Sequence, residues 1–326
     1  MKRTAKTLAV KGLGTPLGSN SFISRRVLRA LKMDYGPFQR NPTYLNGKNS
    51  ISCVSVDFDV TRPSRFEDNR NGTRALLGLA ERYRMPLTWA VCGHSVEDDM
   101  RSYEAILQSP VPKEIGIHTY SHIDAQASSS ESFKADVERC IQVLGLNDRP
   151  KTFIFPWNRE AHFDVLHELG FRAYRGARRA ICSPVETNGL WNIRPVYYVD
   201  QKSLGSADLI KSYLDLCIEH FAVFHLWLHP WSIMIDGQAE PMAQTLDEVF
   251  SYMQEKRNEG TLDFLTMGEL AFRLDVASPK SRAQQERPQE VRSRPAENFG
   301  EATRGHGPVD LTLVDPSRGD EVRSSH

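Results

Sequence analysis

The sequence predicts an α/β protein built on a parallel β-sheet or a (β/α) barrel, and two observations support this. Between residues 49 and 277, short apolar runs alternate with segments in which apolar residues recur at helical spacing. This alternation is typical of parallel sheets, whose strands are joined by helices. The composition is that of a globular protein, with 40% hydrophobic, 25% charged and 9% aromatic residues. It excludes a collagen, a coiled-coil rod and a chain that is disordered throughout.

The expected strands, about seven, are the apolar runs at residues 51–56, 86–91, 115–118, 152–155, 171–174, 193–196 and 222–228. The expected helices are residues 73–84, 130–144, 163–169, 207–220 and 246–256. Ser130 and Glu131 open the second helix with a pattern typical of helix N-termini. Phe133, Val137 and Leu144 follow at helical spacing, which gives this helix one apolar side.

Charge is divided unevenly along the chain. The whole sequence balances 41 Lys and Arg residues against 41 Asp and Glu residues, but residues 1–48 hold ten basic residues and one acid, Asp34. Residues 49–277 carry 23 basic and 32 acidic residues, and residues 278–326 carry eight of each. The chain therefore divides into a basic N-terminal arm (1–48), an acidic α/β domain (49–277) and a tail (278–326). We expect the tail to be disordered because it is rich in Gln, Glu, Arg, Pro and Ser.

The basic arm contains one helical patch, at residues 27–32. This patch either packs on its own domain with its basic face in water or makes peripheral contact with an anionic membrane surface. The balanced overall charge is unlike that of a polybasic nucleic-acid-binding protein, so no nucleic-acid partner is expected.

Three features predict a cytoplasmic location. No apolar run approaches the roughly 20 residues that a transmembrane helix needs. Lys6 and Lys11 interrupt the stretch that would form the apolar part of a secretory signal. The five cysteines are odd in number and include no Cys-x-x-Cys pair, so we expect reduced thiols.

Two carboxylates stand at the end of the first expected strand. Asp57 and Asp59 are two residues apart, so their side chains leave the strand on the same face, about 7 Å apart. Two carboxylates at this separation repel each other unless a cation or a proton intervenes, which is typical of catalytic pairs. The alternative is a helix cap or a solvated loop acid.

Histidines follow two other expected strands. His118 and His122 come after the strand at 115–118, and on a helical turn this spacing brings both imidazoles within reach of one metal ion. The spacing is weak evidence by itself, because His225 and His229 repeat it. The second pair lies in a strand pattern, where four residues span about 13 Å and cannot share one ion. We expect His225 to be a buried structural residue and His229 to lie at the end of its strand.

These positions share one property, which is that each lies at or just after the carboxyl end of an expected parallel strand. In α/β barrels and open sheets, active sites assemble at that edge. Two histidines and a carboxylate, with a further carboxylate and histidine nearby, are suited to metal-assisted hydrolysis. The same ligand set occurs in Fe(II) oxygenases, but those proteins would show an all-β pattern, which this chain lacks.

Several stretches, in this order, resemble the polysaccharide deacetylase family, the carbohydrate esterases with a NodB-homology domain. The most specific is the segment from His118 to His122, which follows the family's H-[ST]-x-x-H motif. Together the matching stretches cover about residues 51–272. They are residues 55–59 for the strand-end aspartate pair, 84–91 for the second strand, 116–122 for the histidine motif, 226–229 for a late L-x-L-H motif and 264–270 for the closing segment.

The resemblance implies a distorted (β/α) barrel with residues 49–277 as the catalytic domain. It implies that Asp59, His118 and His122 bind a divalent metal ion, usually zinc. It also implies that Asp57 acts as general base and His229 as general acid. The expected reaction removes an N-acetyl or O-acetyl group from a carbohydrate substrate, and the cytoplasmic location suggests an intracellular glycan precursor or oligosaccharide.

One motif departs from the family pattern. The family commonly has an Arg-x-Pro segment whose arginine orients the base, and here Ile154 stands at the arginine position. Arg159, Arg175 and Arg178 are candidates to replace it, and Arg175 is the first choice because it follows the strand expected at 171–174. Trp157, in the same segment, either forms a substrate-binding wall or belongs to the core. We place Trp157 and Arg175 in the substrate-binding part of the site.

Two other functions remain open at this point. The chain is an allantoinase-like hydrolase of a small amide, or it is a non-catalytic module that binds a glycan or a partner with a defective site. The absent motif arginine favours the second alternative. Evidence against it is that all five candidate catalytic and metal-binding residues stand at the strand ends, namely Asp57, Asp59, His118, His122 and His229.

Overall fold

The computed structural model describes residues 49–60, 63–146, 148–176 and 184–277, which all lie in the first of the chain's two compact units, Met1–Glu286. The basic arm (1–48) and the tail (278–326) lie outside the described residues, as do Arg178 and Cys182. The expectations for these segments therefore remain predictions.

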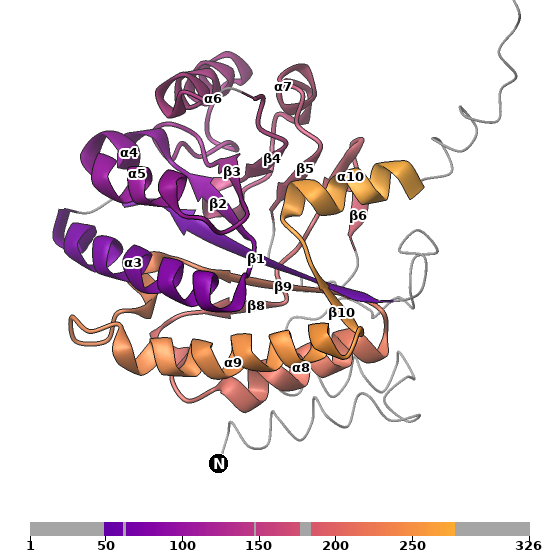
Figure 1. The fold of residues 1–326 in the computed structure, drawn as a ribbon. Coiled ribbons are helices and arrows are strands. Elements are labelled where there is room, and N and C mark those ends of the chain that lie inside the picture. Colours follow the sequence, from indigo (N-terminus) through magenta and orange to yellow (C-terminus); the bar gives the residue numbers. More distant parts are fainter. Residues whose placement is uncertain (1–48, 61–62, 147, 177–183, 278–326) are drawn as a thin grey trace, which may run out of the picture. The chain divides into compact units, whose positions relative to one another are not determined.

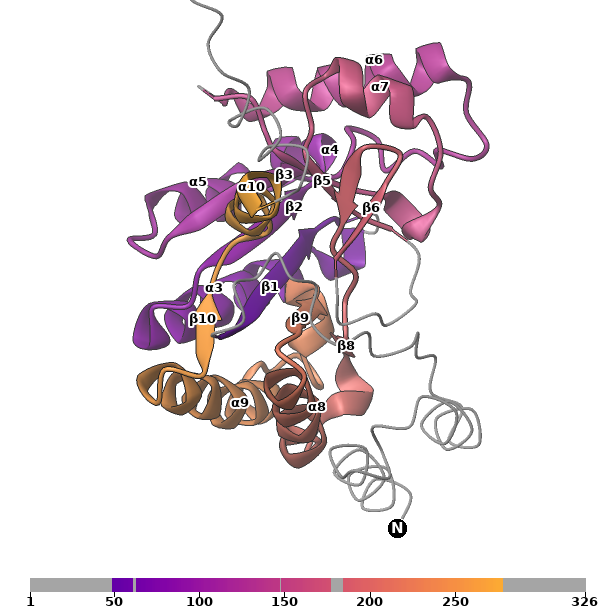
Figure 2. The same ribbon diagram turned by 90° about the vertical axis from the view of Figure 1, so that its right-hand side faces the viewer.

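The centre of the described unit is one curled β-sheet (Figures 1 and 2). Its strands are β1 (Ser50–Phe58), β2 (Leu87–Val91), β3 (Lys113–Ile117), β4 (Thr152–Ile154), β5 (Ala173–Arg175), β6 (Val185–Thr187), β7 (Leu190–Asn192), β8 (Tyr197–Val199), β9 (Val223–Leu228) and β10 (Leu262–Phe264). Within the described residues the strand order is β6-β7-β5-β4-β3-β2-β1-β9-β8, and β10 pairs with β1 off this path. Each pairing between these strands is parallel except that of β6 with β7. The open half-barrel confirms the expected distorted barrel.

Helices surround the sheet, most of them on its outer side (Figure 1). They are α3 (Phe66–Tyr83), α4 (Gly93–Asp98), α5 (Met100–Gln108), α6 (Ser130–Leu144), α7 (Phe163–Glu168), α8 (Ala207–Glu219), α9 (Glu240–Asn258) and α10 (Met267–Ala277). Short 3-10 helices lie at η2 (Pro63–Arg65), η3 (Pro156–Asn158), η4 (Gln201–Ser203) and η5 (Pro230–Ile233). Helix α3 packs against α5 and α9, α9 packs against α8, and α4 packs against α6. None of the described helices combines the length and apolarity that crossing a membrane would require.

Strand β1 is buried along its whole length, and its two faces have different partners. Val54, Val56 and Phe58 belong to the large apolar core that includes the outer helices. Ile51 and Cys53 belong to a second apolar cluster, formed with α10. Because successive strand residues point to opposite faces, β1 divides the two clusters and α10 closes the amino-terminal part of the inner face.

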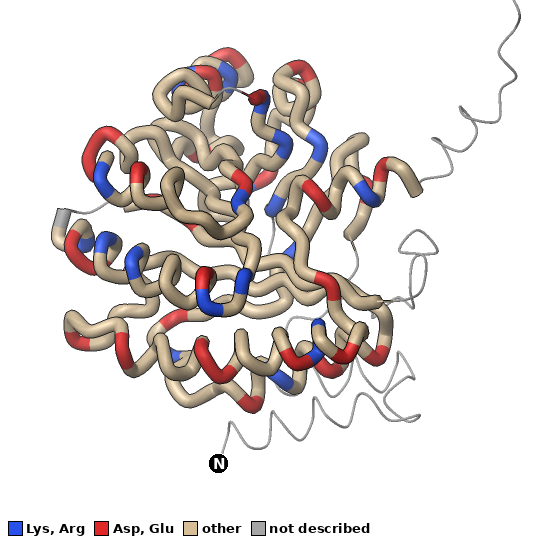
Figure 3. The backbone as a smooth tube through the Cα atoms, in the orientation of Figure 1, with Lys and Arg blue, Asp and Glu red and all other residues tan. Residues whose placement is uncertain are grey.

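Polar residues replace apolar ones towards the carboxyl end of this inner face. Ser55 and Asp57 continue the alternation on β1, Asp59 follows the strand, and each is buried. Charged residues elsewhere lie mainly on the outer helices (Figure 3). Of the four Asp, Glu, Lys or Arg residues that are buried in the described part of the chain, three are Asp57, Asp59 and Arg175. Since burying a charge is costly unless it is paired, this end of the sheet is the place to look for a functional site.

The structure corrects one expected strand. Residues 193–196 are not a strand, because β7 ends at Asn192 and β8 begins at Tyr197. Pro195 lies between them and has no backbone N–H to donate to a strand neighbour. The remaining expected strands overlap β1, β2, β3, β4, β5 and β9. The sequence did not predict α4, α5 or the β6–β7 hairpin, whose elements are too short for a clear periodicity.

Candidate active site

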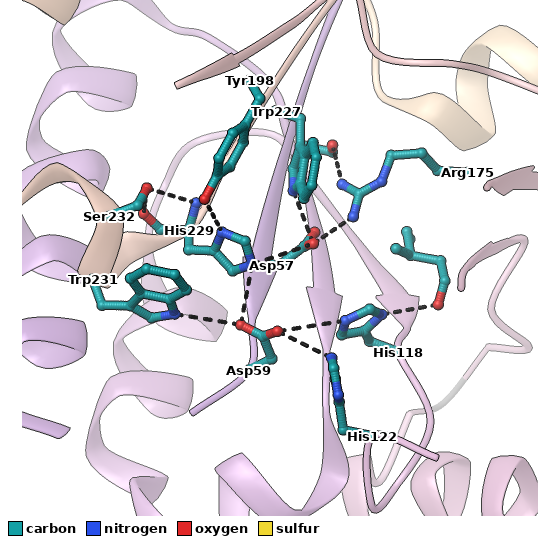
Figure 4. Close-up of polar contacts among 12 residues, drawn as sticks. Asp57, Asp59, His118, His122, Arg175, Tyr198, Trp227, His229, Trp231 and Ser232 are labelled. Atoms are coloured by element: carbon teal, nitrogen blue, oxygen red, sulfur yellow. Dashed lines mark hydrogen bonds and ion pairs between the residues drawn. The ribbon is translucent and has the colours of Figure 1, made fainter. Parts of the chain in front are cut away.

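A cavity of about 590 Å³ opens at the carboxyl ends of the strands. It brings together the seven residues singled out from the sequence: Asp57, Asp59, His118, His122, Trp157, Arg175 and His229. Its other lining residues are Arg65, Phe155, Asn158, Tyr198, Trp227 and Trp231. Figure 4 shows the two aspartates between His118 and His122 on one side and His229 and Trp231 on the other.

Asp59, His118 and His122 form a candidate metal site. The Asp59 Oδ2 atom lies 3.2 Å from His122 Nε2 and 3.7 Å from His118 Nε2, and the three ligand atoms are all within 4.8 Å of one another. His118 Nδ1 lies 2.9 Å from the carbonyl oxygen of Ile154 and donates a hydrogen bond to it, because a carbonyl can only accept. A neutral His118 therefore turns the lone pair of Nε2 towards Asp59, the arrangement found in metal-bound histidines.

The electrostatics of Asp59 agree with this arrangement. Burial alone would raise the pKa of Asp59, but the imidazoles of His229, His118 and His122 hold the pKa well below its usual value of 3.8. The carboxylate is therefore ionised over the physiological pH range. It faces imidazole nitrogens whose lone pairs can bind a cation, so this group of atoms has the donor set of a divalent metal site.

A loop rather than a helical turn joins the two histidines, which corrects the local expectation. Thr119 and His122 both have left-handed backbones, with φ of 63° and 58°. Asp136 on α6 holds this loop in place by accepting hydrogen bonds from the Tyr120 N–H (2.7 Å) and from the Ser121 hydroxyl (2.6 Å). The two imidazoles still converge, because the loop turns back over the end of β3.

Asp57 lies under an arginine from another strand. Arg175 Nη2 donates a hydrogen bond to Asp57 Oδ2, and the indole N–H of Trp227 donates to the same oxygen at 2.8 Å. Burial alone would raise the pKa of Asp57, but the nearby Arg175, with His118 and His229, holds the pKa below its usual value of 3.8. The other carboxylate oxygen, Oδ1, is buried and accepts no hydrogen bond from the described residues.

Arg175 stands one strand away from the position where the family motif has its arginine. Ile154 on β4 and Arg175 on β5 are paired neighbours in the sheet register, so the two residues lie at the same level of the barrel. Of the other candidates, Arg159 pairs with Asp124 near the surface, and Arg178 lies outside the described residues. Arg175 is thus the candidate arginine that the structure places beside Asp57.

Two buried polar residues, Ser55 and His225, are linked to Arg175 by a chain of hydrogen bonds. Arg175 Nη1 donates to Ser55 Oγ at 2.8 Å, and Ser55 Oγ lies 2.8 Å from His225 Nε2. His225 Nδ1 donates to the carbonyl oxygen of Ile193 at 3.0 Å, so Nε2 accepts the Ser55 hydroxyl proton. Burial and the nearby Arg175 lower the pKa of His225 to about 3. His225 is therefore a buried neutral residue, in agreement with the structural role expected from the sequence.

His229 occupies the other side of the cavity, directly after β9. Its Nε2 lies 3.5 Å from Asp59 Oδ1 and 3.7 Å from Asp57 Oδ2, and its Nδ1 lies 3.2 Å from the Tyr198 hydroxyl. The ring stacks on Trp231 with 4.4 Å between centroids. His229 therefore faces the space between the two aspartates with a fixed ring orientation.

Two further tryptophans, Trp157 and Trp231, line the cavity. Trp157 is 63% exposed and meets the His122 ring edge-on with 4.7 Å between centroids, so it is not a core residue. Its φ of 57° is left-handed, which is unusual for a large side chain. Trp231, on η5, directs its indole N–H towards Asp59 Oδ1 at 3.5 Å. The exposed Trp157 indole is therefore an aromatic surface that a ligand in the cavity can reach.

Sequence reasoning missed several residues that line or support the cavity, among them Ser55, Arg65, Tyr198, Trp227 and Trp231. A signal existed for two of them, because Ser55 and Trp227 lie two residues before Asp57 and His229 and therefore share their strand faces. The other three reach the cavity through local backbone turns or through β8, and no motif marked them.

Comparison with known proteins agrees with this geometry. The polysaccharide deacetylase family model matches residues 46–174, which contain Asp57, Asp59, His118, His122 and Trp157. No curated protein matches the chain.

Solved structures share the fold at low sequence identity. A Mycobacterium smegmatis protein named as a polysaccharide deacetylase superposes with a TM-score of 0.58 and 17% identity, over 79% of this chain and 98% of that chain. A Pseudomonas aeruginosa PAO1 protein named in the same way gives 0.56 and 16%, over 72% and 94%. The Puue allantoinase gives 0.55 and 16%, over 73% and 95%. The match of residues 46–174 to the polysaccharide deacetylase family model and the shared fold are what the resemblance to a divergent member of that family leads us to expect.

Proposed function

We propose that the protein is a metal-dependent hydrolase that removes the acetyl group from an acetylated amino sugar. This proposal rests on one observation, which is that two aspartates lie in the same cavity and have different partners. Asp57 is bound by Arg175 and Trp227, whereas Asp59 is surrounded by imidazoles. One carboxylate is thus placed to handle protons and the other to bind a cation.

The residues present fit a divalent metal ion. Asp59, His118 and His122 would hold it, and one carboxylate with two imidazoles is a common ligand set for zinc. The buried Nδ1 of His122 has no partner among the described residues, so that ring is oriented through its Nε2 contact with Asp59. A bound zinc ion would supply Lewis-acid polarisation of the acyl oxygen and stabilise its developing negative charge.

Asp57 acts as the general base in this proposal. Its Oδ2 is occupied by the Arg175 and Trp227 donors, which leaves Oδ1 to take a proton from the attacking water. Arg175 keeps the carboxylate ionised and fixes its plane. The arginine thereby does from β5 what the family's motif arginine does from the position of Ile154.

His229 supplies the second proton transfer. When water adds to the acyl carbon and the carbon–nitrogen bond breaks, the leaving nitrogen must take up a proton. His229 lies across the two aspartates from His118 and His122 (Figure 4), and the Tyr198 hydroxyl at Nδ1 fixes the ring. The products are then acetate and a free amino sugar.

The cavity walls support a sugar as the substrate. Exposed Trp157 offers a flat apolar surface at the cavity, which suits the face of a sugar ring. A volume of about 590 Å³ lies in the range of small-molecule sites. The expected intracellular substrate and the membrane contact of the basic arm stay predictions.

The proposal is tested by measuring acetate release by the zinc-loaded full-length protein. Suitable substrates are N-acetylglucosamine and its short oligomers, with and without a chelator, and allantoin serves as the competing amide. Chelator-sensitive acetate release supports the proposal. Ring opening of allantoin with no acetate release would favour the small-amide hydrolase, and full zinc occupancy without turnover of either substrate would favour the non-catalytic module.

A further inference from the structure

One arginine that lines the proposed active-site cavity, Arg65, has no carboxylate partner among the described residues of the cavity. Arg65, at the end of η2, lines the cavity and is half-buried. Among the residues that the structure describes, no Asp or Glu lies within salt-bridge distance of Arg65. Arg175, the other arginine among the described residues that line the cavity, is buried and bound to Asp57. Arg65 is therefore available to a ligand in a way that Arg175 is not.

Trp231 sets the position of Arg65 relative to the reacting groups. The Arg65 guanidinium lies 3.8 Å from the centroid of the Trp231 ring, which is cation–π distance. The same indole stacks on His229 and directs its N–H to Asp59. One indole thus separates the guanidinium from the proposed general acid and metal site. Stacking covers one face of the guanidinium and leaves the N–H groups at its edge for an acceptor.

A second feature of the cavity also lacks a partner. The amide oxygen of Asn158 is buried and accepts no hydrogen bond from the described residues. Asn158 follows Trp157 and shares its left-handed backbone, with φ of 56°. A buried polar atom without a partner costs free energy, so its presence in a cavity is explained by a donor that a ligand supplies. A hydroxyl or amide N–H of the substrate has the required chemistry.

Building on the proposed deacetylation, we propose that the natural substrate carries an anionic group, a carboxylate or a phosphate, which Arg65 binds. A planar guanidinium matches both anions through two parallel N–H···O hydrogen bonds. A neutral polysaccharide would leave the Arg65 charge unpaired beside the bound ligand. Arg65 is then a specificity-determining residue for acidic amino sugars, and it takes no part in the proton transfers.

The test compares one neutral and two anionic probes with the zinc-loaded full-length protein. The probes are N-acetylglucosamine, N-acetylglucosamine 6-phosphate and N-acetylmuramic acid, which carry no anion, a phosphate and a carboxylate. The variants are Arg65→Gln, which removes the charge, and Arg65→Lys, which keeps it without the planar fork. Arg74→Gln is the matched control, because Arg74 lies exposed on α3 outside the cavity.

We expect wild type to prefer at least one anionic probe by kcat/KM. In Arg65→Gln the ratio of anionic to neutral kcat/KM should fall about 10- to 100-fold, the usual effect of losing a charge-assisted hydrogen bond. Arg65→Lys should fall less, and Arg74→Gln should keep the wild-type ratio. The probe whose ratio falls more identifies the anion as phosphate or carboxylate. An unchanged ratio in Arg65→Gln, or a wild-type preference for the neutral sugar, overturns the inference.

Calorimetric binding of the same probes separates this inference from the proposed function. If an anionic probe binds wild type and loses affinity in Arg65→Gln but no probe releases acetate, the anion site stands and the deacetylase proposal fails. If acetate is released with no dependence on Arg65, the deacetylase stands and the anion site fails. If neither anionic probe binds or reacts better than the neutral sugar, the anion site is wrong.

Discussion

Arg175, the last residue of β5, donates a hydrogen bond to Asp57, near the end of β1, although three strands, β4, β3 and β2, lie between β5 and β1 in the sheet. The arginine stands beside Ile154 in the register of β4 and β5. Both charged groups are almost completely buried, with 1% and 2% of their side chains exposed. A buried pair of this kind has consequences for stability that can be measured without knowing the substrate.

Replacing Arg175 with Met should strongly destabilise the protein, because Asp57 would keep a buried charge without its partner. Removing one member of a buried ion pair typically lowers the free energy of unfolding by about 3–5 kcal/mol. The double variant Arg175→Met, Asp57→Asn should regain much of that loss, since neither charge remains. Urea denaturation of the wild type, both single variants and the double variant measures the coupling. Additive effects of the two substitutions would show that the pair is not coupled.

Ser55→Ala should cost about 1–3 kcal/mol of unfolding free energy, because it leaves two buried polar atoms without a partner. Ser55 Oγ is the contact of both Arg175 Nη1 and His225 Nε2, at 2.8 Å each. Ser55→Thr keeps the hydroxyl and should recover most of the stability. The comparison is made by denaturation with all three proteins. If alanine and threonine behave alike, the hydroxyl has no part in holding Arg175.

The lowered pKa of His225 predicts that the folded protein loses stability in acid. Burial and Arg175 lower its pKa in the folded protein to about 3, against an ordinary value of 6.5. As the pH falls below 6.5, the unfolded chain binds a proton at His225 before the folded protein does, and the unfolded state gains stability. Above pH 6.5 the contribution is constant; between pH 6.5 and 3 it should fall by about 1.4 kcal/mol for each pH unit.

The matched variant for this effect is His225→Gln, which does not titrate. The difference between the wild-type and variant pH profiles of unfolding free energy should show the predicted slope below pH 6.5 and none above it. Parallel profiles across that range would show that His225 is protonated equally easily in both states.

His118→Ala should remove tightly bound zinc from the protein, because it deletes one of the three candidate ligands. The hydrogen bond from His118 Nδ1 to the Ile154 carbonyl directs the Nε2 lone pair of this ligand towards the site. Metal analysis after dialysis should give about one zinc per wild-type chain and a much smaller fraction for the variant. His94→Ala is the control, since His94 is a 57% exposed histidine paired with Asp98 outside the cavity. Full zinc occupancy in His118→Ala would mean that the metal site lies elsewhere.

Much of this site could be predicted from the sequence because parallel strands bring their carboxyl ends to one edge. That rule alone predicts that Asp57, Asp59, His118 and His229 lie close together. Arg175 could be proposed because it follows a strand, but its contact with Asp57 depends on the strand order. A sequence does not give that order directly.

Other features depend on backbone details that residue patterns do not reveal. Thr119 and His122 adopt left-handed conformations, so the histidine pair converges through a loop where helical spacing suggested a turn. Arg65 lies over the Trp231 ring, although the two residues are far apart in the sequence and belong to no motif. The strand expected at residues 193–196 is absent, because Pro195 has no backbone N–H for a strand hydrogen bond and the apolar residues beside it do not compensate for this.

The central claim is that Asp57 handles protons while Asp59 binds the metal, and the variant Asp57→Asn tests it most directly. Asparagine keeps the shape of Asp57 but cannot accept the proton of the attacking water. With zinc content measured on the same sample, we expect acetate release to fall about 10²- to 10⁴-fold, the usual contribution of a general base, while about one zinc per chain remains. Acetate release at the wild-type rate by a zinc-loaded Asp57→Asn protein would contradict the account.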